Sequence, residues 1–302
     1  MPLRIVCVAA ALSAVLCGAA LAAHDVAPGS NGRIVFQRGG TDNEPFTRDA
    51  EIYTISTAGR SLRRLTKNRY YDGNPVWSPD GRKIAFESDR RGDSDIFVMD
   101  ANGTHVRELT FSEGYDGNPA WSPDGSQIVF QSSRDGTSDL WVTDVDGRNQ
   151  HAVVAGPDDE FDPSWSIDDT LAYVVRTDED AYSIWTSDVF GNDAKQLSAS
   201  AGVNKDPMWS PDGARIAFES NRNGNYDVYV MGADGSHLRD LTTSPGLDAL
   251  PAWSPSGTKL VFVSDRAAKH HREIYTIPAS GGRVLRVTHN KRWNTAPDWQ
   301  TR

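Results

Sequence analysis

Cysteine is almost absent from this chain of 302 residues, and the only two copies are Cys7 and Cys17. Both lie in a short N-terminal segment that differs in composition from the rest. Beyond that segment there is no thiol and therefore no disulfide, so the remaining chain has to be stabilised by a packed core. A chain of about 280 residues is long enough to bury one.

Charged side chains are missing from residues 5–23, which follow Arg4 and contain only Ile, Val, Cys, Ala, Leu, Ser and Gly. The run ends in Ala20-Leu21-Ala22, a small-x-small pattern suited to signal peptidase. A charged start, an apolar middle and a small-residue end predict a cleaved signal peptide over residues 1–23. We therefore expect a periplasmic or secreted protein with a single domain over residues 24–302.

Two alternatives for this segment are less favoured. The run is about long enough to serve as an uncleaved membrane anchor, but no basic stop-transfer cluster follows it. A lipoprotein signal would need a small residue before the modified Cys17, and Leu16 stands there. The mature chain is therefore expected to have no membrane span.

Basic blocks and catalytic motifs are lacking as well. The chain has 41 acidic and 31 basic residues, a formal net charge of -10 and no Lys/Arg-rich stretch, so nucleic acid and anionic lipid are unsuitable partners. None of the seven histidines has a metal-ligand spacing, and no G-x-S-x-G elbow, P-loop or dinucleotide fingerprint occurs. Ser, His and Asp are frequent enough for a triad assembled from distant loops, but no motif marks one. No catalytic residues are predicted.

Tryptophan marks an internal repeat of 44 residues. Five units begin at Trp77, Trp121, Trp165, Trp209 and Trp253, and Trp299 follows the last of them. Most units open with a Ser-Pro-Asp-Gly turn, in which Pro fixes φ and Gly supplies a left-handed residue. The unit at Trp165 continues Ser-Ile-Asp-Asp instead, so an irregular turn is expected there. Short runs rich in β-branched and aromatic residues follow each turn, which indicates strands and not helices.

Four short strands per repeat of this length are typical of a propeller blade. The N-terminal part supplies strands two to four of one more unit, beginning at Ile34, Ile52 and Leu65, and the chain end at Trp299 supplies its first strand. The sequence therefore predicts an all-β, six-bladed propeller. Residues 31–66 and 295–302 would together form the closing blade, and closure would remove exposed sheet edges.

Units of the form Pro-x-Trp-Ser-Pro-Asp-Gly followed by Ile-Ala-Phe-x-Ser-x-Arg resemble the TolB-type propeller repeats, also called PD40 repeats and related to WD40 repeats. The resemblance covers residues 31–302. It implies a TolB-like propeller fold. TolB-type proteins include a periplasmic partner of a peptidoglycan-associated lipoprotein, which carries an α/β domain before its propeller. Here no such domain is expected, because the propeller would start directly after the signal peptide.

Two kinds of repeated residue are interpreted as structural. The Trp that opens each unit and an aromatic residue on each third strand are expected to form the core between blades, not to display rings to a sugar. Arginine and acid pairs also recur, and they are Arg90 with Asp95, Arg134 with Asp139, Arg222 with Asp227, and Arg266 with Glu273. Because one active site would not be copied four times, we interpret them as ion pairs that hold the hairpin between the second and third strands.

One repeated position favours a binding site. An acid or amide stands three residues before each first-strand proline, and the six are Asp72, Asp116, Glu160, Asn204, Asp248 and Asn294. The innermost strand of a blade borders the central channel, so these side chains are predicted to form a ring at one channel mouth. Tyr71, Tyr115 and Trp293 stand beside them and would supply apolar contact to a ligand.

Converging carboxylates repel one another unless a cation or a basic group offsets their charge. Carboxylate and amide oxygens suit Ca²⁺, so we expect the ring to bind Ca²⁺ through Asp72, Asp116, Glu160 and Asp248, or else a basic group of a peptide. The alternative is that each side chain only caps its own turn. The lack of thiols and of a histidine cluster argues against zinc or copper.

The sequence thus favours a monomeric, exported binding module for a protein or peptide, an inference that rests partly on analogy. One rival is a glycan lyase or hydrolase that uses the channel mouth, since repeats of this type also occur in oligogalacturonide lyases and next to peptidase domains. The other rival is a passive structural component of the cell envelope. No peptidase domain follows Trp299 and no histidine cluster lies in the repeat positions that face the channel, which disfavours catalysis.

Overall fold

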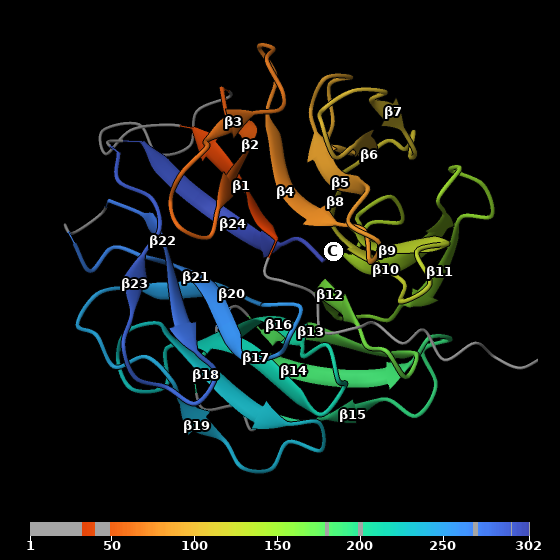
Figure 1. Ribbon diagram of the computed structural model, residues 1–302. Coiled ribbons are helices and arrows are strands. Elements are labelled where there is room, and N and C mark those ends of the chain that lie inside the picture. Colours follow the sequence, from red (N-terminus) through yellow and green to blue (C-terminus); the bar gives the residue numbers. More distant parts are fainter. Residues whose placement is uncertain are drawn as a thin grey trace, which may run out of the picture.

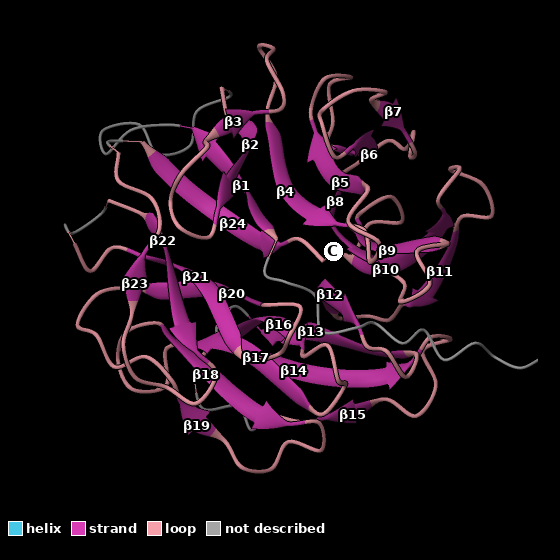
Figure 2. Ribbon diagram, viewed as in Figure 1, coloured by secondary structure: helices cyan, strands magenta, loops and turns pink. Residues whose placement is uncertain are grey.

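The computed structural model describes residues 32–39, 49–178, 181–198, 202–267, 271–290 and 292–301; the predicted signal peptide lies outside them. Six four-stranded antiparallel sheets are arranged around a central axis (Figure 1). Each regular element in the described ranges is a strand (Figure 2). The predicted six-bladed propeller is therefore confirmed.

The blades are numbered here along the chain, and their strands run from the channel outward. Blade 1 contains β4 (Asp72–Trp77), β5 (Lys83–Ser88), β6 (Asp95–Asp100) and β7 (Arg107–Glu108). Blade 2 contains β8 (Asp116–Trp121), β9 (Gln127–Ser132), β10 (Asp139–Asp144) and β11 (His151–Val154). Blade 3 contains β12 (Asp159–Trp165), β13 (Thr170–Asp178), β14 (Ala181–Asp188) and β15 (Lys195–Gln196).

The remaining blades follow the same order, except that the last one joins the two ends of the chain. Blade 4 contains β16 (Asn204–Trp209), β17 (Arg215–Ser220), β18 (Asp227–Gly232) and β19 (Arg239–Asp240). Blade 5 contains β20 (Asp248–Trp253), β21 (Lys259–Ser264), β22 (Glu273–Pro278) and β23 (Leu285–Arg286). Blade 6 contains β24 (Trp293–Trp299), β1 (Arg33–Gly39), β2 (Glu51–Ser56) and β3 (Arg63–Arg64).

Blade 6 closes the ring in the predicted way. Its innermost strand, β24, pairs antiparallel with β1, and Ile34 lies opposite Trp299. The Trp299 side chain is only 3 % exposed and packs with Phe36 and with Val261 of blade 5. The two ends of the chain therefore share both a hydrogen-bonded ladder and a core, and Figure 1 shows the blue β24 beside the red β1.

The core lies between the blades. Successive residues of a strand point to opposite faces of the sheet. On β1, Ile34 and Phe36 pack against blade 5, whereas Val35 packs against Trp77 and Ile84 of blade 1. Each blade is apolar on both faces, which explains why its second strand is an unbroken apolar run. A single blade could bury neither face alone.

The two aromatic positions of the repeat belong to this core, as predicted, although not equally in every blade. The first-strand tryptophan is buried in blades 1, 2, 5 and 6, and half-buried at Trp165 and Trp209. The third-strand aromatic is likewise buried in blades 1, 4 and 5, and half-buried in the others. Packing is thus less complete around blade 3 than around blade 1.

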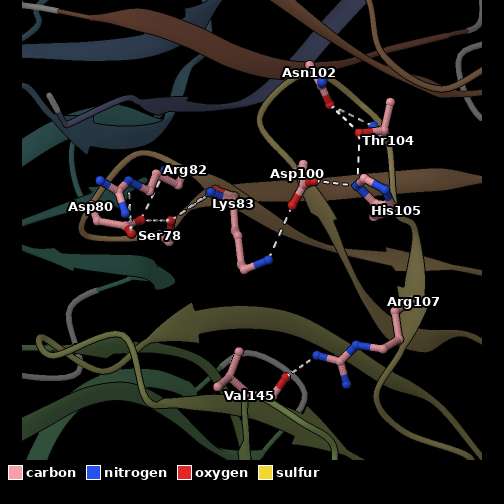
Figure 3. Close-up of polar contacts among 10 residues, drawn as sticks. All are labelled: Ser78, Asp80, Arg82, Lys83, Asp100, Asn102, Thr104, His105, Arg107 and Val145. Atoms are coloured by element: carbon pink, nitrogen blue, oxygen red, sulfur yellow. Dashed lines mark hydrogen bonds and ion pairs between the residues drawn. The ribbon is translucent and has the colours of Figure 1, made fainter.

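The Ser-Pro-Asp-Gly turn forms a hydrogen-bond network of its own (Figure 3). The Ser78 hydroxyl donates to the Asp80 carboxylate over 2.6 Å, and the same carboxylate accepts the Arg82 backbone N–H over 3.0 Å. Gly81 closes the turn at a φ of 66°, where a residue without Cβ is favoured. Close to this turn, Asp100 accepts from both Lys83 and His105 (Figure 3).

The turn after Trp165 is irregular in one specific way: it is one residue shorter. The Ser166 N–H bonds the Thr170 carbonyl, whereas in blade 1 the Ser78 N–H bonds the Lys83 carbonyl. Asp169 takes the glycine position with a φ of 55°. Aspartate tolerates this left-handed conformation better than most residues, so the turn persists without Pro or Gly.

Candidate functional site

A β-bulge in the first strand of each blade turns one side chain toward the channel. The strand register shifts there in all six blades. The residue before the proline has a φ between 43° and 53°, and the six are Asn74, Asn118, Asp162, Asp206, Leu250 and Ala296. All six line a cavity of about 100 Å³ on the channel axis. We call them the channel ring.

The channel ring is polar on one side and apolar on the other. The Asn74 amide donates to the Asn118 side-chain oxygen over 2.7 Å, and the Asn118 amide donates to Asp162 over 2.8 Å. Blades 1 to 3 are therefore joined by a continuous hydrogen-bonded arc, and the Asp206 backbone N–H, which bonds Asp162, extends it to blade 4. Leu250 and Ala296 complete the ring from blades 5 and 6 without a polar side chain. The sixfold repeat is thus asymmetric at its axis.

Three carboxyl groups meet beside this arc, and we call Asp162, Asp206 and Glu219 the carboxyl trio. Glu219 lies on β17 and accepts the Leu250 backbone N–H over 3.0 Å. Burial raises the pKa of all three carboxyl groups, and the charges of Asp162 and Glu219 raise the Asp206 pKa further. The positive charge of Lys205 lowers each of the three pKa values and so offsets part of this rise. Acids this close cannot all ionise freely, so all three pKa values lie above the ordinary carboxyl range.

Aromatic and cationic side chains gather at the channel end where the first strands begin, which we call the polar mouth. The Lys205 ammonium lies 4.3 Å from the centre of the Tyr182 ring, and Phe161 meets Tyr182 edge-on at 5.8 Å. The Arg272 guanidinium lies 4.7 Å from the centre of the Trp293 ring. Burial lowers the Arg272 pKa, so this cation is held largely away from water. Cations over aromatic faces attract each other electrostatically.

Tyr71 and Tyr115, both predicted ligand-binding residues, fold back over the first strand. The Tyr115 hydroxyl donates to the Glu87 carboxylate over 2.8 Å, and burial is the main reason why the Tyr115 pKa is raised. The ring lies across Gly117, where a Cβ would come within 1.9 Å of the Tyr115 oxygen. Tyr71 covers Gly73 in the same manner. Glycine is therefore required at these two positions for the tyrosines to lie against the backbone.

The predicted ring of first-strand acids is placed differently from the expectation. Asp72, Asp116 and Asp248 are fully buried within their blades and do not line the channel cavity, which begins two residues further along. Each is paired with an arginine of its own blade at 2.6 to 2.7 Å, and the pairs are Asp72–Arg90, Asp116–Arg134 and Asp248–Arg266.

These pairs correct the interpretation of the repeated arginines. Arg90 was expected to pair with Asp95, and the other arginines with the matching third-strand acid. Instead each arginine reaches back to the first strand, and in blade 4 Arg222 likewise bonds the Asn204 oxygen over 2.7 Å. Asp95 accepts from the Thr110 hydroxyl instead. The reason is geometric: the arginine follows the second strand, whose last serine lies directly opposite the first-strand acid.

The last two members of the predicted ring have different surroundings. Asn294 donates to the Glu273 carboxylate over 3.0 Å and to the Arg272 backbone carbonyl over 3.2 Å. Glu160 is buried, and its Oε2 atom has no hydrogen-bond partner. Asp116 Oδ1 and Asp248 Oδ1 also lack a partner. Unlike those acids, Glu160 forms no ion pair with an arginine among the described residues.

The expected Ca²⁺ site stays a prediction. Within the part of the chain that the structure describes, no group of three or more His, Cys, Asp or Glu residues is arranged to hold a metal ion. Asp72, Asp116 and Asp248 already have an arginine that offsets their charge. A cation is therefore not needed at these three positions for charge balance.

The channel ring and the carboxyl trio were missed at the sequence level. Their signal is present in the sequence, because Asn, Asn, Asp and Asp precede the prolines of blades 1 to 4. The acids of the predicted ring stand two residues before the residues that line this cavity. Lys205 and Tyr182 carry no repeat signal of their own.

The opposite channel end is a wider cavity of about 440 Å³. The six first-strand tryptophans and the prolines of the following turns line it. Asp298 lies between the two cavities and accepts the Trp77 N–H over 2.7 Å, and burial raises the Asp298 pKa to about 6. Apart from Asp298 and Asp212, this end presents no acid to a ligand among its described lining residues.

Comparison with known families and proteins agrees with this architecture. The family model described as TolB beta propeller domain, PD40, matches residues 46–140, 91–200 and 136–302. A TolB homolog of Chlorobium chlorochromatii is 47 % identical over 45 residues, which is 15 % of this chain and 10 % of that protein. The sequence match thus spans about a tenth of that relative's length.

Solved structures share the fold at low identity. TolB from Acinetobacter baumannii superposes with a TM-score of 0.76 and 21 % identity, covering 89 % of this chain and 66 % of that one. A putative TolB from Agrobacterium tumefaciens gives 0.69 and 21 %, covering 90 % and 92 %. An oligogalacturonate lyase in complex with manganese gives 0.54 and 17 %, covering 85 % and 74 %. Among the described residues no helix has the length and hydropathy to cross a membrane.

Proposed function

Because the chain belongs to the TolB β-propeller (PD40) family, we propose that it is an exported binding module, at the cell envelope or outside the cell, whose ligand is a protein or peptide. The polar mouth is the binding surface in this proposal. TolB structures among the similar folds support the class of function. A propeller fold alone would not, since unrelated functions share it.

The observation that carries the proposal is the carboxyl trio beneath an aromatic and cationic rim. Glu219 is buried, whereas Asp162 and Asp206 are half-buried and line a cavity on the channel axis. A donor group of a ligand, such as an amine or a backbone N–H, would stabilise the ionised acids there. Tyr182 and Trp293 offer the amphipathic surfaces that anchor protein partners.

The first test is cross-linking of the tagged, full-length protein in its host, followed by purification and mass spectrometry. Tyr182→Ala and Trp293→Ala remove aromatic anchors from the polar mouth. Phe190→Ala is the matched control, because Phe190 is 74 % exposed in the turn after β14, at the opposite end of the propeller. We expect a defined set of partners with the wild type and with Phe190→Ala, and its loss from both mouth variants.

Two outcomes would contradict the proposal. One is an identical partner set for all three variants, which would place the interface elsewhere. The other is the absence of any partner together with turnover of uronate oligosaccharides by the purified protein, which would support the lyase or hydrolase alternative.

A further inference from the structure

Buried first-strand acids are held by the same set of donors in three blades. In blade 2, Asp116 accepts from Arg134 over 2.7 Å and from the loop residue Ser112 over 2.8 Å. Ser132, opposite the acid, accepts from the Arg134 Nε atom over 2.8 Å and so orients the guanidinium. The equivalent residues are Arg90, Ser88 and Asn68 around Asp72, and Arg266, Ser264 and Ser244 around Asp248.

Blade 3 keeps the acid but has lost all three of these residues. Val175 lies opposite Glu160 in the place of the serine. Two residues later, Thr177 stands in the place of the arginine, and Gly156 stands four residues before the acid in the place of the loop donor. Glu160 is nevertheless only 6 % exposed, and its Oε2 atom has no hydrogen-bond partner. A buried carboxyl group without a donor is destabilising, so its retention calls for a reason.

The charged groups around Glu160 do not replace the missing arginine. Asp139 on β10, together with Asp158 and Asp159, adds negative charge, and burial together with these charges raises the Glu160 pKa to about 7. The nearby cation, Arg176, is engaged by Asp159, to which its Nε atom donates over 3.0 Å. Asp139 accepts the Gly156 N–H over 3.3 Å. Excess negative charge therefore remains at Glu160.

The aromatic part of the arginine environment is still present in blade 3. In blade 2 the Arg134 guanidinium lies 4.3 Å from the Trp141 ring and 5.6 Å from the Phe130 ring. The same registered pair in blade 3 is Tyr173 opposite Trp185. Both rings remain, and no cation is stacked on either of them among the described residues. Tyr173 is only 1 % exposed, whereas Trp185 is half-buried, so Trp185 is the ring that a ligand can reach.

We infer that Glu160 is a subsite for a guanidinium group of a protein partner, with the half-buried Trp185 as its stacking surface. In blades 1, 2, 4 and 5 the same arrangement of strands holds an arginine of the chain beside two aromatic rings. In blade 3 the arginine would come from outside the chain. Gly156 leaves an approach open, because a Cβ there would meet nothing closer than Glu160 at 3.5 Å. The inference deepens the proposed function, because it names a chemical group that the partner must carry.

A guanidinium fits these residues better than a metal ion. The described residues contain no group of three ligands arranged for a metal. Asp159 is bonded to Arg176, and Asp139 is bonded to backbone, so neither is free to converge on an ion with Glu160. A planar cation needs only the one carboxylate and one accessible ring.

The test uses a small probe, so that it is independent of whether the partner is found. N-acetyl-arginine amide is titrated into the full chain at pH 8 and pH 5.5, and the Glu160 carboxyl and the Gly156 and Val175 amides are followed by NMR. We expect saturable shifts at pH 8 and at least tenfold weaker binding at pH 5.5, where Glu160 is protonated. Glu160→Gln should abolish the shifts. Asp178→Asn, which removes an exposed charge nearby, should leave them unchanged.

A second variant returns the arginine of the repeat. Thr177→Arg should pair with Glu160 as Arg134 pairs with Asp116, lower the Glu160 pKa and compete with the probe. The inference is overturned if Glu160→Gln binds the probe as well as the wild type does, or if neither protein binds it. It is also overturned if Ca²⁺, and not the probe, shifts the same signals. Loss of partner capture with normal probe binding would count against the proposed function only.

Discussion

Blades 2 and 3 are neighbours built on the same frame, and they treat their first-strand acid in opposite ways. In blade 2, Asp116 is fully buried and paired with Arg134. In blade 3, Glu160 is buried without a donor for Oε2, and its pKa is raised to about 7. Both blades have four antiparallel strands, a register shift in the first strand and an aromatic pair at the same position. The blade fold therefore forms whether or not its buried acid is paired with an arginine. A blade that lacks the arginine is a place where a cation from a ligand can take over that pairing.

The largest expected difference between these blades concerns the tryptophan. Trp121 in blade 2 is 8 % exposed, whereas Trp165 in blade 3 is half-buried. We expect Trp121→Ala to lower the free energy of unfolding by about 3 to 5 kcal/mol, because it leaves a cavity in the core between blades. Trp165→Ala should cost clearly less. Denaturant unfolding of both variants measures this, and equal losses would show that the two blades are packed alike.

Removing the arginine from blade 2 should leave its buried acid without an ion pair, as in blade 3. Arg134→Ala leaves Asp116 buried and unpaired, which we expect to cost about 3 kcal/mol at pH 7. The loss should shrink as the pH falls, because the unpaired carboxyl group then takes up a proton. Thr177→Ala, at the same repeat position in blade 3, should change stability by less than about 0.5 kcal/mol. A small effect of Arg134→Ala at pH 7 would mean that the pair contributes little.

Neutralising the first-strand acid should change the free energy of unfolding in opposite directions in the two blades. The Glu160 pKa is raised in the folded state, so the native protein binds more protons than the unfolded chain, and stability falls as the pH rises from about 4.5 to about 7. Glu160→Gln removes this loss, so in the absence of a partner we expect it to stabilise the protein by about 1 to 3 kcal/mol at pH 8. The gain should vanish near pH 4.5.

Asp116→Asn is the matched variant, and it should destabilise the protein at pH 8 because Arg134 loses its counter-charge. Thermal melts at both pH values test the contrast. A destabilising Glu160→Gln at pH 8 would show that Glu160 is already well compensated in the free protein.

The smallest expected effect concerns the shortened turn of blade 3. Ile167 occupies the position that is proline in the Ser-Pro-Asp-Gly turns, and the Asp169 N–H bonds the Ser166 carbonyl just as Gly81 bonds Ser78. Ile167→Pro should therefore fit and raise stability by about 0.4 to 1 kcal/mol, by reducing the entropy of the unfolded chain. A lower melting temperature would show that the shorter turn has a different φ at this residue.

The sequence alone determined the number of blades, the strand order, the closure through Trp299 and the aromatic core. These follow from the repeat, because each unit has the same short apolar runs and must pack against the next. The position of the site was not determined in this way. Which side chains enter the channel depends on a bulge of one residue, and a shift of one or two positions along a strand changes what a side chain faces.

Only the tertiary structure decided the partners of the charged groups. Arg90 has two candidate acids, Asp95 five residues later and Asp72 eighteen residues earlier, and only the register of β4 against β5 selects Asp72. Likewise Asp162, Asp206 and Glu219 are brought together by adjacent blades around the axis, and no local sequence pattern predicts that they lie close together. Local propensity and periodicity fix strands and cores. The electrostatics of a site depends on distances between segments far apart in the chain, which only the folded ring sets.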